Sequence, residues 1–250
     1  MRKTLTLAAA LLFAVSMQAA ELTVDEILAK NAEAKGGLEK MRAVKSMKFT
    51  GKMSFGPMEA PFVMTKKRPE QMKVDFTIQG MTATQAYDGT TGWAVMPFMG
   101  KKDPEAMSGD DLKSAKEQAD FDGPFVDYAK KGNTVELLGK ADVEGTPAYK
   151  VKLVTKEGTE SVVYVDAESF LEIKIESKRK VQGQDVETET VIGNYQEVEG
   201  LLFPFSIESK AKGMPGGQVI TIEKVELNAA VEDAAFKMPE KKAAPEAVKQ

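Results

Sequence analysis

Hydrophobic and polar residues alternate along most of the chain, and the clearest example is the segment at residues 46–55. There Met47, Phe49, Met53 and Phe55 alternate with serine, lysine and threonine. A period of two predicts a β-strand with one apolar face and one face in contact with water. The same alternation recurs at residues 72–78, 149–153, 171–175, 201–207 and 219–227, with turns that contain glycine between the segments.

Two regions show helical spacing instead. The first begins at Val24, after Thr23 and with Glu26 shortly beyond it, which is the pattern of a capping box. The second, at residues 108–131, separates two groups of strands and predicts either a lid or a fixed layer. No linker divides the chain, so we expect one α+β domain with a strongly curved antiparallel sheet of about 10–11 strands and helices on one face.

The ends of the chain differ from the middle. Residues 1–20 have the layout of a secretory signal peptide, with a basic start and an apolar run too short to span a membrane. An uncleaved anchor is the alternative. We expect the mature domain at residues 21–239 and a flexible charged tail at residues 240–250. Because the chain has no cysteine, we expect no lipid anchor, and the expected location is the periplasm.

The composition restricts the possible chemistry. The chain has no histidine and no cysteine, and its net charge is −4. These absences exclude disulfides, His-paired nucleophiles, and metal sites built from histidine or thiolate. The negative charge argues against nucleic-acid binding. We expect no enzyme, no catalytic residue, no metal and no cofactor, and a carboxylate-dependent hydrolase is the remaining catalytic alternative.

Methionine is frequent in the first half of the chain. Ten of the 14 methionines lie between Met41 and Met107, on segments that also carry phenylalanine. Flexible, polarizable methionine suits surfaces that adapt to varied apolar partners, but it also fills cores. The pattern therefore predicts a Met-rich core, an apolar cavity, or both. The candidate cavity residues are Phe49, Met53, Phe55, Met64, Phe76, Trp93, Met96, Phe98, Phe121, Phe125 and Tyr128.

Trp93 is the only tryptophan and follows the turn in the segment YDGTTGW at residues 87–93. This segment lacks the spacing of a phosphate-binding loop and is predicted to be a hairpin turn. Strand alternation places Trp93 and Val95 on one face and Met96 and Phe98 on the other. These side chains therefore cannot all line one wall, and the sequence leaves open which set faces the cavity.

Several segments resemble the outer-membrane lipoprotein-sorting proteins of the LolA-like superfamily. They are YQEVEGLLFP at residues 195–204, VITIEKVELN at 219–228, VEDAAFKMP at 231–239, GLEKMRAVKSMKFTGKM at 37–53, and the YDGTTGW turn. The resemblance implies an unclosed β-barrel, with helices as a lid on the concave face and an apolar cavity for acyl chains. By location, Arg42 and Arg68 are the candidates for the arginine that contacts the lid in that family.

The resemblance also implies a function. It suggests a monomeric periplasmic carrier that binds the acyl chains of lipoproteins or lipids and sorts them to the outer membrane. Inner- or outer-membrane transport or sensor proteins are the implied partners. The alternative is a sensor or regulatory module for a membrane protein, similar to RseB.

Overall fold

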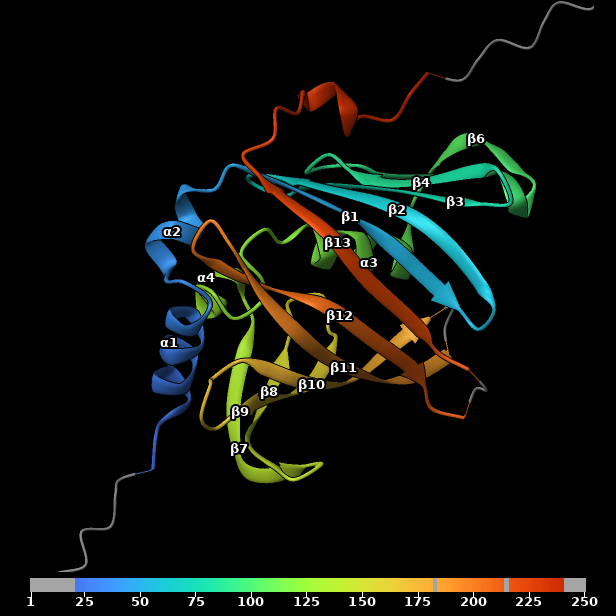
Figure 1. Cartoon of the computed structure of the whole chain (residues 1–250). Helices are drawn as coiled ribbons and strands as arrows, with labels where there is room; N and C mark the ends of the chain where they lie inside the picture. Colours follow the sequence, from blue (N-terminus) through green and yellow to red (C-terminus); the bar gives the residue numbers. More distant parts are fainter. Residues whose placement is uncertain (1–20, 182–183, 214–215, 241–250) are drawn as a thin grey trace, which may run out of the picture.

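The computed structural model describes residues 21–181, 184–213 and 216–240. The predicted signal peptide at residues 1–20 lies outside these ranges, as does the predicted tail beyond residue 240. The described part is an antiparallel sheet with short helices beside it (Figure 1). This arrangement confirms the predicted α+β class and the curved sheet.

The sheet has thirteen strands rather than the predicted 10–11. Their bounds are β1 (Ser46–Phe55), β2 (Met58–Lys67), β3 (Gln71–Ile78), β4 (Met81–Tyr87), β5 (Gly92–Met96), β6 (Lys101–Ala106), β7 (Thr134–Val143), β8 (Thr146–Val154), β9 (Glu160–Asp166), β10 (Glu172–Val181), β11 (Gln184–Val198), β12 (Leu201–Ala211) and β13 (Gln218–Leu227). The prediction missed β6 because the sequence KKDPEA has no apolar alternation. An exposed edge strand needs none, and its charges and Pro104 discourage pairing with other chains.

The strand order is β6-β5-β4-β3-β2-β1-β13-β12-β11-β10-β9-β8-β7. Strands β1 and β13, from opposite ends of the described chain, pair at the centre and join the two halves. The sheet does not close, because β6 and β7 are its two edges. The predicted helical insertion lies between these two edge strands in the chain, so it connects the two sides of the opening.

Four α-helices accompany the sheet: α1 (Val24–Ala34), α2 (Leu38–Ala43), α3 (Gly109–Ala119) and α4 (Tyr128–Lys131). The predicted capping box at the start of α1 is present. The Thr23 amide donates to Glu26 Oε2 at 2.7 Å, and the Glu26 amide donates to Thr23 Oγ1 at 3.3 Å. Helix α3 contacts β3, β4 and β5 on one side and β10 on the other. The sheet therefore curves around α3, and the α3 side is its concave face.

Apolar side chains fill the concave face of the first half of the sheet. One cluster lies on β1, β2, β12 and β13 and contains Phe49, Phe62, Phe205, Ile222 and Val225, all buried. A second cluster holds α3 against the sheet through Met72, Tyr87, Ala115 and Ala119. The methionine-rich strands thus form core, which is one of the two predicted alternatives.

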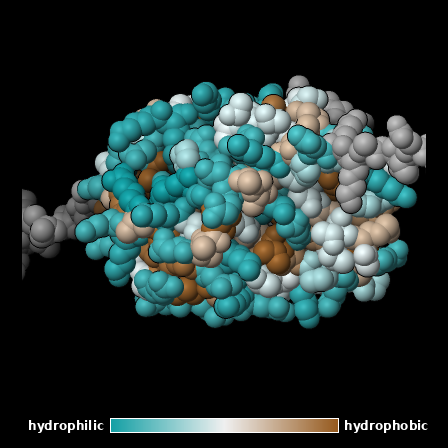
Figure 2. Space-filling view, turned by 90° about the horizontal axis from the view of Figure 1, so that it is seen from above, coloured by the Kyte–Doolittle hydropathy of each residue, from teal (hydrophilic) through white to brown (hydrophobic). Residues whose placement is uncertain are grey.

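The convex face of β5 is covered by the C-terminal segment. Trp93 is 3% exposed, and its Nε1 donates to the Phe236 carbonyl at 2.7 Å. Phe236 itself is fully buried. On β2, the Lys67 ammonium donates to the Val231 carbonyl at 2.8 Å and to Asp233 at 2.5 Å. Seen from above, the molecular surface is mostly hydrophilic, with small separated hydrophobic patches (Figure 2).

Candidate functional site

A hollow of about 810 Å³ lies on the concave side, between the helical segment and strands β8 to β12. Its apolar floor consists of Leu153, Val163, Ile175 and Ile192, one from each of β8, β9, β10 and β11. Phe125 from the segment between α3 and α4 also lines it. The volume is in the range of small-molecule sites, and the apolar floor is surrounded by a polar rim that includes Lys116, Glu117, Lys131, Lys156 and Glu157.

A buried polar cluster lies at one end of this hollow. Glu172, 8% exposed, pairs with the Lys35 ammonium group at the end of α1. The Tyr195 hydroxyl donates to the Glu172 carbonyl oxygen at 2.9 Å and lies 3.3 Å from Glu172 Oε2. Burial alone would raise the pKa of Glu172, but the Lys35 charge holds it below its ordinary value. Burial and the nearby carboxylate raise the pKa of Tyr195, so its hydroxyl stays a donor.

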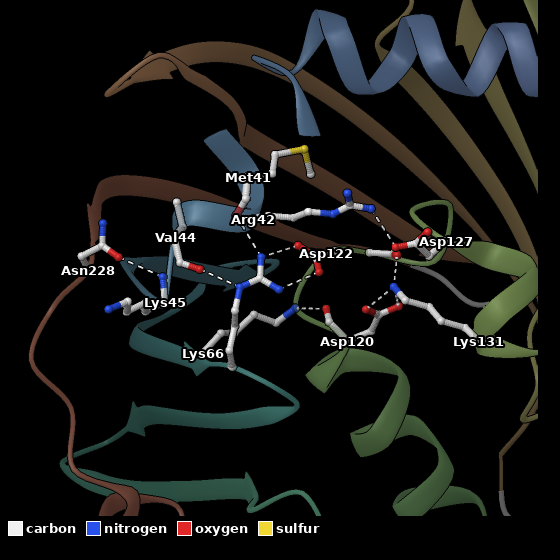
Figure 3. A network of polar contacts seen from close by, with 12 residues as sticks. Met41, Arg42, Val44, Lys45, Lys66, Asp120, Asp122, Asp127, Lys131 and Asn228 are labelled. Atoms are coloured by element: carbon white, nitrogen blue, oxygen red, sulfur yellow. Dashed lines mark hydrogen bonds and ion pairs between the residues drawn. The ribbon is translucent and has the colours of Figure 1, made fainter. Parts of the chain in front are cut away.

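Arg68, which follows β2, ties the helical segment to the sheet (Figure 3). Its Nη1 and Nη2 donate to the two Asp122 carboxylate oxygens at 2.7 Å and 2.5 Å. Its Nε donates to the Val44 carbonyl at 2.7 Å, and Nη2 donates to the Met41 carbonyl at 2.9 Å. The guanidinium group also lies 4.3 Å from the centre of the Phe121 ring. Bidentate contacts of this kind are among the stronger polar interactions in proteins.

Lys66 holds the same segment at a second point, and Lys131 makes contacts within the segment itself (Figure 3). The Lys66 ammonium donates to the Asp120 carbonyl at 2.9 Å. Lys131 donates to both Asp120 carboxylate oxygens, at 2.6 Å and 2.8 Å, and to the Gly123 carbonyl at 2.7 Å. Burial lowers the pKa of Lys66 to about 8, against the opposing effect of the Asp120 charge. We call residues 108–131 the lid, and the contacts that Arg68 and Lys66 make with it the latch.

Arg42 makes a third contact with the lid, but at the surface. Its Nη2 lies 2.8 Å from Asp127 Oδ2, and the two side chains are 53% and 36% exposed. Both arginines that the sequence analysis selected by location therefore contact the lid. Arg68 makes the more buried contact, with exposed fractions of 26% for Arg68 and 19% for Asp122.

The predicted cavity residues separate into distinct places. Phe125 lines the hollow. Phe49, Met53, Met64 and Phe76 belong to the filled core of the first half, and Phe121 packs in a cluster with Val44 and Leu201. Phe98 lies against Phe76, with ring centres 5.9 Å apart, and Phe55 lies at the exposed end of β1 with 38% of its surface accessible. Met96 shares the concave face with Gly92, and Tyr128 donates a hydrogen bond to Asp25 at 2.8 Å.

Trp93 requires a correction, because the structure places it on the convex face. It pairs with Ala86, which pairs with Lys73, whereas neighbouring Gly92 pairs with Tyr87 beneath α3. Trp93 therefore packs under the C-terminal segment and is not part of the hollow. Of the two faces left open by the sequence, the one that carries Met96 faces the concave side.

Sequence reasoning missed Glu172 because a bulge changes its face. Strict alternation places Glu172 on the water-facing side, opposite Ile175. In the structure, the β9–β10 register shifts between Glu172 and Lys174, so Glu172 and Ile175 point to the same side. A bulge of this kind leaves no mark in the pattern of apolar residues.

The described residues show no group of three histidine, cysteine, aspartate or glutamate side chains that could hold a metal ion. In the same ranges, none of the helices has the length and apolar character needed to cross a membrane.

No protein-family model and no curated protein matches the sequence. Solved structures do match in fold. They include a domain described as an outer membrane lipoprotein-sorting protein from Vibrio parahaemolyticus, with 11% identity, coverage of 84% of this chain and 94% of that chain, and a TM-score of 0.58. A DUF1329 family protein from Desulfovibrio piger has 12% identity, coverage of 86% and 97%, and a TM-score of 0.60.

A LolA superfamily protein from Nitrosomonas europaea is similar to the same degree. It has 14% identity, coverage of 87% of this chain and 98% of that chain, and a TM-score of 0.59. The chain therefore has the fold of LolA-superfamily proteins, an unclosed antiparallel barrel with a helical lid, as the sequence resemblance predicted. At these identities the likeness defines the fold, and the function has to be argued from the site.

Proposed function

We propose that the chain is a carrier that holds the acyl part of a lipoprotein or lipid in the hollow beneath the lid. The observation that carries this proposal is the hollow of about 810 Å³, with an apolar floor from four strands and a lid latched over it. The fold, shared with a protein described as lipoprotein-sorting, supports the same conclusion. The proposed location is the periplasm, and the proposed destination of the cargo is the outer membrane.

Burial of an acyl chain supplies enough free energy for tight binding. Each buried CH₂ group contributes about 0.8 kcal/mol, so a chain of about 16 carbons gives a gross gain of ~13 kcal/mol. Micromolar affinity needs only about 8 kcal/mol, which leaves room for the entropic cost of association. The floor residues Leu153, Val163, Ile175 and Ile192 provide the apolar contact. Tight binding therefore needs no specific polar recognition.

Movement of the lid would change access to the hollow, because Phe125 and Pro124 of the lid also line it. The latch opposes this movement through Arg68 on the sheet side and Asp122 on the lid side. We propose that a membrane transport protein, at the donor or acceptor membrane, opens the latch during transfer. No step of this proposal requires a catalytic residue.

A paired substitution in the hollow tests the proposal. Ile192 lines the hollow, whereas its neighbour Val191 lies on the other face and is 45% exposed. Ile192→Trp should fill the hollow and weaken binding of a fluorescent fatty acid with a 16-carbon chain at least tenfold. Val191→Trp is the matched control and should leave the affinity unchanged.

Mass spectrometry of protein exported to the periplasm and purified without detergent should show bound lipid or lipoprotein. Protein that is free of lipid, and that binds neither the fatty acid nor a lipidated peptide, would contradict the carrier function. Capture of the periplasmic part of a membrane protein by such lipid-free protein would favour the regulatory alternative instead.

A further inference from the structure

A second cavity, of about 320 Å³, lies among the helices. One wall comes from α1 and α2, through Leu28, Ala29, Ala32, Leu38 and Met41. The facing wall comes from the lid, through Pro124, Phe125, Val126 and Ala129. These apolar side chains offer contact surface for a hydrocarbon chain, and Asp25, Asn31, Asp122 and Asp127 line the same cavity.

The smaller cavity and the hollow share a partition. Lys35, Glu172, Pro124, Phe125 and Lys130 line both spaces. The two cavities therefore adjoin at these side chains. Three of the five, Pro124, Phe125 and Lys130, belong to the lid, so any movement of the lid that admits a ligand also changes the partition.

The volumes indicate how many chains each space accepts. A methylene group takes up about as much space as a molecule of liquid water, about 30 Å³, so a chain of about 16 carbons needs roughly 480 Å³. The hollow of about 810 Å³ has room for one such chain. The smaller cavity of about 320 Å³ adds most of the room that a second chain needs.

The polar groups of the partition lie where the two chains of such a ligand would meet. Lys35 pairs with Glu172 and is 26% exposed, and the Tyr195 hydroxyl lies beside the same carboxylate. The Lys35 ammonium group has three N–H donors, so it can donate to an ester carbonyl while it stays paired with Glu172. The geometry therefore provides an apolar compartment on each side of a polar junction.

On the basis of the proposed function, we infer that the smaller cavity is a second acyl-chain subsite, and that the cargo is a lipid or lipid-modified protein with two acyl chains. One chain lies in the hollow and the other between α1–α2 and the lid. The ester junction lies at the partition, beside Lys35 and Glu172. A single-chain ligand occupies the hollow alone.

Substitutions that fill only the smaller cavity test this inference. Ala29 lies on α1, lines the smaller cavity but not the hollow, and is exposed enough for a large side chain to be tolerated. Ala34 lies on the same helix and lines neither space, so Ala34→Trp is the matched control. Ala129→Trp fills the cavity from the lid side and serves as a second variant should Ala29→Trp fold poorly.

The probes are a phosphatidylcholine with two 16-carbon chains, supplied in vesicles, and the lysophosphatidylcholine with one. After removal of the vesicles, mass spectrometry measures the lipid bound per protein. The wild type should bind both probes. Ala29→Trp and Ala129→Trp should bind at least tenfold less of the two-chain lipid and the same amount of the one-chain lipid, while Ala34→Trp should behave as the wild type does.

The outcomes separate the two proposals. A wild type that binds only the one-chain lipid, or an Ala29→Trp variant that binds the two-chain lipid normally, overturns the second subsite and leaves the carrier function standing. Equal loss of both probes in Ala29→Trp also overturns it, because the cavity then has no selective role. A wild type that binds neither probe overturns both proposals.

Discussion

Replacing Arg68 by methionine should release the lid without unfolding the sheet. The substitution removes four hydrogen bonds, two to Asp122 and one each to the carbonyls of Val44 and Met41. It also leaves the Asp122 carboxylate, 19% exposed, without its cation. Loss of one partner from a buried pair costs about 3–5 kcal/mol. Because this pair is partly exposed, we take the lower limit, about 3 kcal/mol, as the loss in lid stability.

Hydrogen exchange measures this loss directly. A change of 1.4 kcal/mol is a factor of ten in an equilibrium constant, so about 3 kcal/mol predicts roughly 100-fold faster exchange of lid amides. The reporters are the amides of Tyr128 and Lys131, which donate to the Phe125 and Asp127 carbonyls at 3.3 Å and 3.1 Å. Peptides from β8 and β9, which do not contact the latch, should exchange at the wild-type rate.

A matched arginine provides the control. Arg42→Met removes the exposed pair with Asp127, and exposed pairs contribute about 0–1 kcal/mol, so lid exchange should change less than about fivefold. The double variant Arg68→Met, Asp122→Leu should recover part of the loss, because it removes the unpaired carboxylate. Equal effects of Arg68→Met and Arg42→Met, or faster exchange across the whole sheet, would refute the latch.

Three further predictions concern other parts of the fold. Because the pKa of Lys66 falls from 10.5 to about 8 on folding, the unfolded chain binds more protons between these values. The free energy of unfolding should therefore rise by about 3 kcal/mol from pH 8 to 10.5 relative to Lys66→Met, and parallel pH curves in urea would contradict this. Trp93 emission should not respond to a bound fatty acid but should shift to the red in Phe236→Ala, and the opposite pattern would place Trp93 in the hollow. Gly36→Ala should lower the free energy of unfolding in urea by several kcal/mol, because its Cβ would lie 2.2 Å from the Gly200 carbonyl oxygen. Gly37→Ala is the control. Its Cβ meets no atom within 4 Å, so it should cost only the strain of its positive φ, about 1–3 kcal/mol.

Elements with a strong local pattern were predictable from the sequence. The strand at Ser46–Phe55 and the capped helix at Val24–Ala34 have the residues that their local geometry demands. Strand β6, Lys101–Ala106, was missed because it exists through pairing with β5 rather than through its own pattern. Edge strands carry little local information, because only one side of the strand is paired and neither face is buried.

The candidate site was only partly predictable, because alternation identifies two faces but does not tell which space is filled. Phe49 and Phe76 lie on the concave side as expected for cavity residues, yet neighbouring side chains fill the space above them. The hollow lies instead against β8 to β11, where the floor residues are smaller, such as Val163 and Ile175. Whether an apolar face becomes core or cavity depends on side chains from distant strands, and the sequence does not show which strands face each other.

The positions of core and hollow assign different roles to the two halves of the sheet. The latch residues Lys66 and Arg68 lie at the end of β2, in the filled half, whereas the floor of the hollow lies on β8 to β11. The half that carries β2 therefore anchors the lid, and the other half, where Val163 also belongs to a core cluster with Ile27, accepts the ligand. Since Arg68 lines neither cavity, its loss should not change the contacts of a bound chain. Arg68→Met should accelerate both loading and release of the 16-carbon fatty acid in stopped-flow measurements and leave the ratio of the two rates within about threefold, whereas Ile192→Trp should change that ratio. A tenfold loss of affinity in Arg68→Met, with an unchanged rate of loading, would show that the latch shapes the hollow rather than controlling access to it.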